Sequence, residues 1–277
     1  MTDEPEVPEV PEVPAEEIVI SDGDTLRKAI AVHDAVVDRE VRRLSRRGFV
    51  VAGIATVAAY GAWKWLRLAK REGDVPWPLR RGLEANEKVA EAYFSNRRLS
   101  REFPPSAISA NARVNGGVGL QANYDPDHWR LQIEGMNGQP PASLSLADIK
   151  SFPRRDMTTE LRCIEGWSII VHWTGARLAD VMAKFPPPPR TPYVAMESPG
   201  RGYYVGLDLL SCMHPQTLLA YEINGAPLSW QHGAPLRLAM PVKYGYKQIK
   251  RIATIRYTTV RPPDFWGDRG YDWYGGH

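Results

Sequence analysis

Apolar and polar residues alternate in short segments of the second half of the chain, which is the pattern of β-strands with one buried face. Strands are predicted on this basis at 129–135, 158–163, 193–197, 218–223, 236–242 and 252–260. The Asn224-Gly225 pair favours a tight hairpin turn, because both residue types accept a positive φ. Loops rather than regular helical crossovers join most of these strands. We therefore predict a mixed, mainly β, α+β fold.

Two short helices are predicted among the strands. Ser145 is a typical capping residue, and Asp148 follows it at the spacing of a helix start. Apolar residues recur at helical spacing over 176–185. Four prolines at 186–189 end this second helix, because proline cannot donate the next backbone hydrogen bond.

The first 75 residues follow a different pattern. A Pro-Glu-Val unit occurs three times over 5–13, and proline at every third position favours an extended, solvated chain. We predict a disordered tail over 1–23. Over 24–47 apolar residues recur at helical spacing among charged ones. This predicts an amphipathic helix whose single apolar stripe needs a partner or a membrane surface to cover it.

The segment after this helix resembles an export signal. Arg46 and Arg47 precede an Ala- and Gly-rich stretch of 16 uncharged residues that ends before Lys64, as in a twin-arginine signal. The alternative is a basic helix end followed by a buried core helix. Extended to 48–68, with its end charges snorkelling, the stretch is long enough to cross a bilayer.

The arginines before this segment predict its orientation. Five arginines lie between Arg39 and Arg47, and such a cluster keeps the preceding chain in the cytoplasm. No clear small-x-small cleavage site follows the apolar stretch, so we favour an uncleaved anchor over a removed signal peptide. Residues 75–277 would then form a catalytic body on the periplasmic side of the bacterial inner membrane.

The amino-acid composition limits the classes of function that residues 75–277 can have. The chain is 43% hydrophobic and contains nine tryptophans, enough for a sizeable core. Its net charge of +3 is too small to indicate a nucleic-acid target. Two cysteines exclude a disulfide scaffold. A lone thiol such as Cys163 is either a buried apolar residue or a functional thiolate.

Cys163 lies in a motif that is accompanied by others in a fixed order. Its segment reads Cys163-Ile164-Glu165-Gly166-Trp167-Ser168, and further motifs occupy 213–215, 219–225, 231–237, 241–250 and 261–263. As an ordered set, they resemble the sulfite-oxidase-type molybdopterin oxidoreductases over roughly 110–270. The chain is most similar to the exported catalytic subunits of bacterial protein-methionine-sulfoxide reductases. That branch carries Cys-(Val/Ile)-Glu-(Ala/Gly)-Trp-Ser where sulfite oxidases carry Cys-Ala-Gly-Asn-Arg.

The resemblance implies a molybdenum–molybdopterin cofactor (Mo-molybdopterin) and assigns its contacts. Cys163 matches the family's molybdenum ligand, and therefore the catalytic centre. Lys243 and Lys247 are expected to add positive charge near the pterin phosphate. Gln248 and Ile249 are expected to act through their main-chain groups. The positions that match pterin contacts are Asn115, Val118, Gly119, Ser198, His232, Arg237, Gln248, Ile249 and Lys250.

The chain departs from the family pattern at several positions. Ser198 replaces a threonine and keeps the hydroxyl. His232 replaces an asparagine, and we predict a structural or pterin-facing histidine rather than a general acid. The segment 199–204 is shorter than the insertion that shapes the substrate mouth in the reductases. Arg201 within it either binds an oxyanion near the metal or faces solvent.

The resemblance further implies two-electron oxo transfer to and from sulfoxide-type substrates, methionine sulfoxide among them. The sequence has no Cys-x-x-Cys-His haem motif, so electrons must come from another subunit. By resemblance, that partner is a quinol-linked membrane b-type cytochrome, and the twin-arginine export machinery is a second partner.

Several alternatives remain open at this point. Sulfite dehydrogenation is disfavoured because the Asn-Arg pair is missing after Cys163, and a non-catalytic subunit of a membrane redox complex is the other functional alternative. A Cys163–Cys212 disulfide competes with metal binding. A zinc or Cys–His hydrolase site lacks the required ligand spacing around His172 and His214. The aromatic tail 265–274 is expected to cap the body, or else to form a docking surface.

Overall fold

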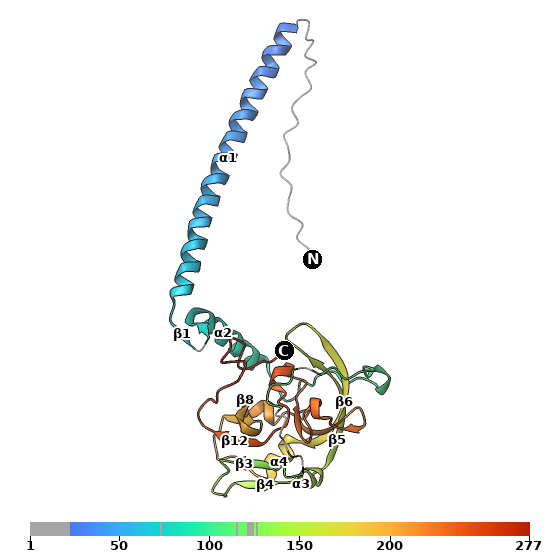
Figure 1. Ribbon diagram of the computed structural model, residues 1–277. Coiled ribbons are helices and arrows are strands. Elements are labelled where there is room, and N and C mark those ends of the chain that lie inside the picture. Colours follow the sequence, from blue (N-terminus) through green and yellow to red (C-terminus); the bar gives the residue numbers. More distant parts are fainter. Residues whose placement is uncertain (1–22, 73, 115, 121–124, 126) are drawn as a thin grey trace. The chain divides into compact units, whose positions relative to one another are not determined.

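The computed structural model describes residues 23–72, 74–114, 116–120, 125 and 127–277, and Figure 1 shows their arrangement into helices and strands. Asn115, one of the predicted pterin contacts, lies outside the described residues, as does the predicted tail up to residue 22. The chain separates into two units, Met1–Arg67 and Leu68–His277.

The first unit consists of one long helix. Helix α1 (Gly23–Leu68) has 46 residues and runs through both the predicted amphipathic segment and the predicted anchor. Its part Arg47–Leu68 is long and apolar enough to cross a membrane. Phe49, Ile54 and Val57 expose more than half of their surface. The most apolar stretch of this span has no buried residue, whereas a core helix needs a covered face. The boundaries predicted within the first 68 residues stay predictions.

The second unit contains two larger β-sheets. The order of the first is β10-β9-β6-β5, with β11 also paired to β9, and the order of the second is β4-β3-β12-β7-β8. All pairs in both sheets are antiparallel except β12 with β3. The strands of the first sheet are β5 (Arg154–Arg162), β6 (Ser168–Arg177), β9 (Leu218–Ile223), β10 (Ala226–Pro227) and β11 (Arg237–Ala239). Those of the second are β3 (Leu131–Glu134), β4 (Ala142–Leu144), β7 (Tyr193–Glu197), β8 (Tyr204–Asp208) and β12 (Thr254–Thr258).

Short helices and one hairpin complete this unit. A small hairpin of β1 (Arg71–Glu72) and β2 (Val75–Pro76) precedes α2. The Ser145 hydroxyl accepts from the Asp148 amide at 3.1 Å, which confirms the predicted helix start. The α-helices are α2 (Trp77–Tyr93), α3 (Leu146–Lys150), α4 (Leu178–Lys184) and α5 (Leu209–Cys212), and the 3-10 turns are η1 (Pro105–Ala107), η2 (Pro199–Arg201), η3 (Trp230–His232) and η4 (Gly245–Lys247).

The larger hydrophobic core draws side chains from both larger sheets. Leu131 and Ile133 of β3, Met196 of β7, and Leu219 of β9 are all completely buried in one cluster. A smaller cluster, which includes Trp173, covers another part of the first sheet. Because each sheet contributes one apolar face, the alternating strands of the sequence account for this core. The predicted α+β, mainly β fold is confirmed.

The strand predictions differ from the structure in two ways. The predicted strand 236–242 contracts to β11, because the chain turns after Ala239. Strands β4, β6, β8 and β10 were not predicted. Strand β6 lies between β5 and β9, and consecutive buried residues cover both of its faces. Its apolar residues therefore do not alternate and carry no period-2 signal.

Candidate functional site

Cys163 lies in the loop that joins β5 to β6. The strands stay paired up to Arg162 and Ser168, and the Cys163 amide donates to the Trp167 carbonyl at 2.9 Å. Gly166 closes the loop with a φ of 88°, a conformation that favours glycine. This hairpin holds Cys163 half-buried with a free thiol, while Cys212 is free and completely buried. The alternative of a Cys163–Cys212 disulfide is therefore excluded.

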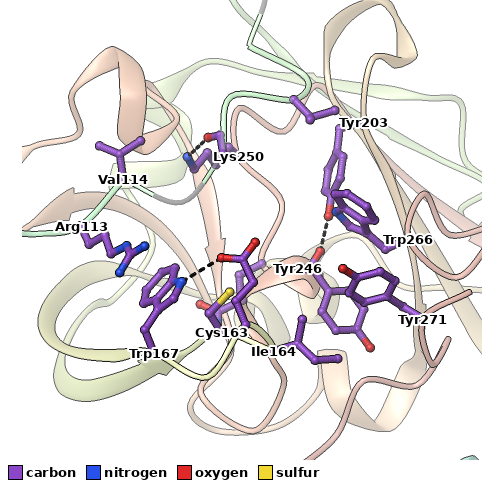
Figure 2. A pocket seen from close by; sticks show the side chains of 15 residues that line it. Arg113, Val114, Cys163, Ile164, Trp167, Tyr203, Tyr246, Lys250, Trp266 and Tyr271 are labelled. Carbon is purple, nitrogen blue, oxygen red and sulfur yellow. Dashed lines mark hydrogen bonds between the residues drawn. The ribbon is translucent and has the colours of Figure 1, made fainter. Parts of the chain in front are cut away.

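A cavity of about 220 Å³ opens beside the Cys163 thiol. Loops from distant parts of the sequence meet there, including the segment that begins at Arg113 and the C-terminal segment that carries Trp266. Figure 2 shows Cys163 between Trp167 and Arg113 on one side and Tyr246, Tyr271 and Trp266 on the other. The cavity thus has a thiol at its wall and aromatic rings on two sides.

The charges nearest Cys163 oppose each other. Burial raises the pKa of the Cys163 thiol, a hydrogen bond from the Glu165 backbone lowers it, and the charge of the Glu165 side chain raises it again. The positive charge of Arg113 acts in the opposite direction. Glu165 is itself positioned by Trp167, whose indole N–H donates to its Oε2 at 3.0 Å. The thiol is therefore neutral in the cofactor-free protein, and a bound metal would have to displace its proton.

Two predicted cofactor residues, Arg237 and Lys250, form a buried positive region. Lys250 Nζ donates to the Gly116 carbonyl at 2.7 Å. Burial and the positive charge of Arg237 lower the pKa of Lys250 to about 7. Arg237 donates to the carbonyls of His232 and Gln248, and burial lowers its pKa to about 10. Two cations that repel each other in a buried region favour the binding of an anion.

Of Val118, Gly119 and Ser198, only Val118 lines the cavity, and the other two support the wall residue Tyr203. Val118 lines the cavity directly. Gly119 has a φ of 82°, and a Cβ there would lie 2.6 Å from the Cβ of Tyr203. The Ser198 hydroxyl accepts from the Tyr203 amide at 2.8 Å. Ser198 thus closes the turn that places Tyr203 in the wall, and its contact with a pterin stays a prediction.

His232, Gln248 and Ile249 make hydrogen bonds within the protein. The two ring nitrogens of His232 lie 2.8 Å from the Ser229 hydroxyl and 3.2 Å from the Ala112 carbonyl. Burial lowers the pKa of His232, which fits a structural histidine better than a general acid. Gln248 lines the cavity, and its side chain donates to two main-chain carbonyls. The Ile249 amide and carbonyl are also hydrogen-bonded, so the main-chain pterin contacts stay predictions.

Lys243 and Lys247 do not add free positive charge beside the cavity, contrary to expectation. Lys247 is completely buried, and its Nζ lies 2.5 Å from Asp264 Oδ2. Lys243 is 1% exposed and pairs with Asp208 at 3.3 Å. Lys247 ends the 3-10 turn η4, and Lys243 precedes that turn. Both side chains are buried, where each charge requires a carboxylate partner. Neither lysine lines the cavity.

The structure also separates residues that the sequence left undecided. Arg201 is 67% exposed and pairs with Glu197 at 3.3 Å, and it does not line the cavity. It therefore faces solvent. Trp266 and Tyr271 of the aromatic tail line the cavity, so the tail does more than cap the body. Sequence reasoning also missed the roles of Arg113, Tyr203 and Tyr246 in the wall, because their loops meet only in the folded chain.

The site fits the implied molybdopterin cofactor. In the part of the chain that the structure describes, no group of three His, Cys, Asp or Glu side chains is arranged to hold a metal. Cys163 is a single soft ligand, which suits a metal that takes its other ligands from its own dithiolene. The buried Nε of Arg237 has no hydrogen-bond partner among the described residues. An anionic group such as the pterin phosphate would satisfy the Arg237 and Lys250 charges.

Comparisons with known proteins agree with this fit. The family model described as the oxidoreductase molybdopterin binding domain matches residues 118–266, more than half of the chain. The protein-methionine-sulfoxide reductase catalytic subunit MsrP of Xanthomonas campestris is 39% identical over 162 residues, covering 53% of this chain and 50% of that protein. A putative protein-methionine-sulfoxide reductase subunit, YedZ1 of Azospira oryzae, is 30% identical over 69% of this chain and 73% of its own length.

The matches to these relatives cover only part of each chain. This chain spans about half the length of the Xanthomonas relatives that it matches. Among solved structures, the sulfane dehydrogenase SoxCD from Paracoccus pantotrophus is similar with a TM-score of 0.47 and 20% sequence identity. That match covers 50% of this chain and 40% of the other.

Proposed function

The chain belongs to the family of oxidoreductases with a molybdopterin-binding domain, and we propose that it reduces sulfoxide-type substrates, methionine sulfoxide among them, by two-electron oxo transfer. The observation that carries this proposal is the Cys163 thiol at the wall of a cavity that also contains Lys250. Cys163 would be the protein ligand of molybdenum. Arg237 and Lys250 would hold the pterin phosphate, with Asn115, Val118, Gly119, Ser198, His232, Gln248 and Ile249 as further contacts.

The residues of the cavity suit a neutral oxidised-sulfur substrate. When bound, the molybdenum cofactor supplies a centre that exchanges two electrons and accepts an oxo group. In the overall reaction the S=O bond breaks, the sulfur gains two electrons, and the oxygen leaves as water after taking up two protons. Glu165 is exposed, lines the cavity beside Cys163 and carries a titratable carboxylate, so we assign it to proton delivery from solvent.

The charge of Glu165 also helps to distinguish sulfoxide reduction from sulfite oxidation. Its negative charge raises the pKa of Cys163, and the same charge disfavours an anion such as sulfite at that position. A neutral sulfoxide has no such cost. The aromatic rings of Trp167, Trp266 and Tyr271 offer apolar contact to the substituents on sulfur. These features favour sulfoxide reduction over the alternative, sulfite dehydrogenation.

We also propose where the protein works and what supplies its electrons. Residues 48–68 would anchor the chain, 24–47 would lie in the cytoplasm, and 75–277 would be periplasmic after twin-arginine export. The membrane-length span Arg47–Leu68 supports this arrangement. A quinol-linked membrane b-type cytochrome would reduce the metal, and the name "catalytic subunit" of the Xanthomonas relatives agrees with a multi-subunit enzyme.

The test combines metal content with turnover. The protein is purified from a host that makes the cofactor, analysed for molybdenum and pterin, and assayed with a reduced dye against sulfoxides, N-oxides, methionine-oxidised protein and sulfite. We expect molybdenum at one site and sulfoxide-dependent dye oxidation. A protein without molybdenum would instead support the non-catalytic alternative, and sulfite oxidation without sulfoxide reduction would support the dehydrogenase.

Replacement of the proposed ligand tests the assignment directly. Cys163→Ser is expected to keep the fold and the pterin but to lower turnover by at least about 100-fold, because second-sphere changes alone cost 10–100-fold. Circular dichroism, pterin content and dye oxidation measure the three properties. Cys212→Ser is the matched control and should retain turnover. Activity near wild type in Cys163→Ser would show that the ligand assignment is wrong.

A further inference from the structure

Two oppositely charged side chains contact the indole of Trp167. Glu165 accepts a hydrogen bond from the indole N–H at 3.0 Å, and both residues line the cavity beside Cys163. The guanidinium of Arg113 lies over the indole ring, with its Cζ 4.4 Å from the ring centroid. Figure 2 shows Arg113 and Trp167 on the same side of Cys163. One indole therefore holds a carboxylate at its edge and a cation on its face.

Arg113 is placed to meet a group that arrives from solvent. It is exposed and lines the cavity. No carboxylate of the described residues lies within ion-pair distance of its guanidinium. The Trp167 ring instead supports it, and a cation over an indole keeps its charge available to a further partner. Arg113 thus differs from Arg201, whose charge is matched by Glu197.

The lining of the cavity also contains exposed apolar side chains. Val114, Val118 and Ile164 line the cavity and are 38%, 46% and 44% exposed, respectively. A lining of this kind can cover the hydrocarbon part of a substrate whose reactive group points to Cys163. An anionic group on the same substrate is disfavoured next to Glu165 but attracted to Arg113.

We propose that Arg113 is a specificity-determining residue that selects sulfoxides carried next to an acidic group. In a peptide, the preferred site would be a methionine sulfoxide flanked by aspartate or glutamate. The neutral sulfoxide enters beside Cys163, its hydrocarbon chain rests on the apolar lining, and the flanking carboxylate binds the guanidinium. This inference rests on the proposed sulfoxide reduction. It adds a preference for substrates that carry a negative charge next to the sulfoxide.

The experiment compares peptides that differ only in the flanking residue. Three methionine-sulfoxide peptides, flanked by Asp, Asn or Lys, are assayed with the molybdenum-loaded protein at low ionic strength. We expect kcat/KM to be roughly tenfold higher for the Asp than for the Lys peptide, mainly through KM. The difference should shrink at about 0.5 M salt, where exposed charges are screened.

Variants separate charge recognition from a structural effect. In Arg113→Gln the Asp-to-Lys ratio of kcat/KM should fall to near one, and Arg113→Lys should restore part of it. Arg97→Gln, which changes an exposed arginine outside the cavity lining, should keep both the ratio and the activity of the wild type. Calorimetric binding of the matching sulfone peptides, which resemble the sulfoxides, gives the same comparison without turnover.

The outcomes distinguish this inference from the proposed function. Equal KM values for the Asp and Lys peptides, or an Arg113→Gln protein that keeps the wild-type ratio, would overturn the role of Arg113. A fall in kcat for all peptides alike, with an unchanged ratio, would overturn it as well. A loaded protein that reduces no sulfoxide overturns the proposed function, and the sulfone-binding series then still decides whether Arg113 reads a flanking carboxylate.

Discussion

The chain contains two kinds of buried cation within a few residues of each other. Lys243 and Lys247 each pair with a carboxylate, Asp208 and Asp264. Arg237 donates only to main-chain carbonyls among the described residues, and its Nε has no partner there. Lys250 donates to the Gly116 carbonyl and is repelled by the charge of Arg237.

This difference separates charges of the fold from charges of the site. A buried cation with a carboxylate partner contributes to the folded protein, and removing one partner leaves the other charge stranded. A buried cation beside another cation carries a cost that a bound anion removes. The Lys247 ammonium also donates to the carbonyls of Gly206 and Trp273. It thereby fixes the aromatic tail that carries two residues of the cavity wall.

The largest expected effect on stability comes from removing the Lys247 charge. Lys247→Met should lower the free energy of unfolding by about 4 kcal/mol, because it strands the buried Asp264 carboxylate. Urea denaturation followed by circular dichroism measures this. Adding Asp264→Asn to the same protein should recover part of the loss. A change below about 1 kcal/mol would mean that the ion pair does not hold the tail.

Removing the Arg237 charge should affect cofactor binding more than folding stability. Arg237→Met should reduce the pterin content of each folded molecule by roughly tenfold or more, because it removes charge-assisted hydrogen bonds to the cofactor. Its cost in the free energy of unfolding of the cofactor-free protein should be smaller than that of Lys247→Met. Lys243→Met is the matched control and should keep its pterin content while losing stability. Equal pterin content in Arg237→Met and wild type would contradict the assignment.

The pH dependence of stability sharpens the comparison at Lys250. Its pKa is about 7 in the folded cofactor-free protein, against about 10.4 in an unfolded chain. Between these values the unfolded state binds more protons, so the free energy of unfolding should rise with pH. We expect a rise of about 2 kcal/mol, less than the full shift implies because the cavity is open to water.

The control for this measurement is Lys250→Met, which lacks the titrating ammonium group. Denaturation of wild type and Lys250→Met across about pH 7 to about pH 10 should give curves that converge at high pH. A bound pterin phosphate should raise the pKa of Lys250 and flatten the wild-type curve. Parallel curves for the two cofactor-free proteins would show that Lys250 does not carry the repelled charge.

Local patterns in the sequence were sufficient for much of the fold. The predicted strand 218–223 matches β9, and the Ser145–Asp148 spacing forms the predicted capping box. These elements depend on neighbouring residues, such as alternation along a strand and a hydrogen bond across one helical turn. Strand β6 was missed because successive buried residues cover both of its faces, which removes the alternation.

Cys163 and the ordered motifs after it indicated the cofactor before any geometry was known. The sequence by itself therefore determined the fold class, the family and the candidate metal ligand Cys163. Only the tertiary structure separated Lys243 and Lys247 from Lys250, because the partners of each lysine, Asp208, Asp264 and Gly116, lie far away in the chain. It also brought Arg113 to Trp167 and the aromatic tail to the cavity. Such contacts between distant segments leave no periodic signal, since they are decided when the two sheets close around one core.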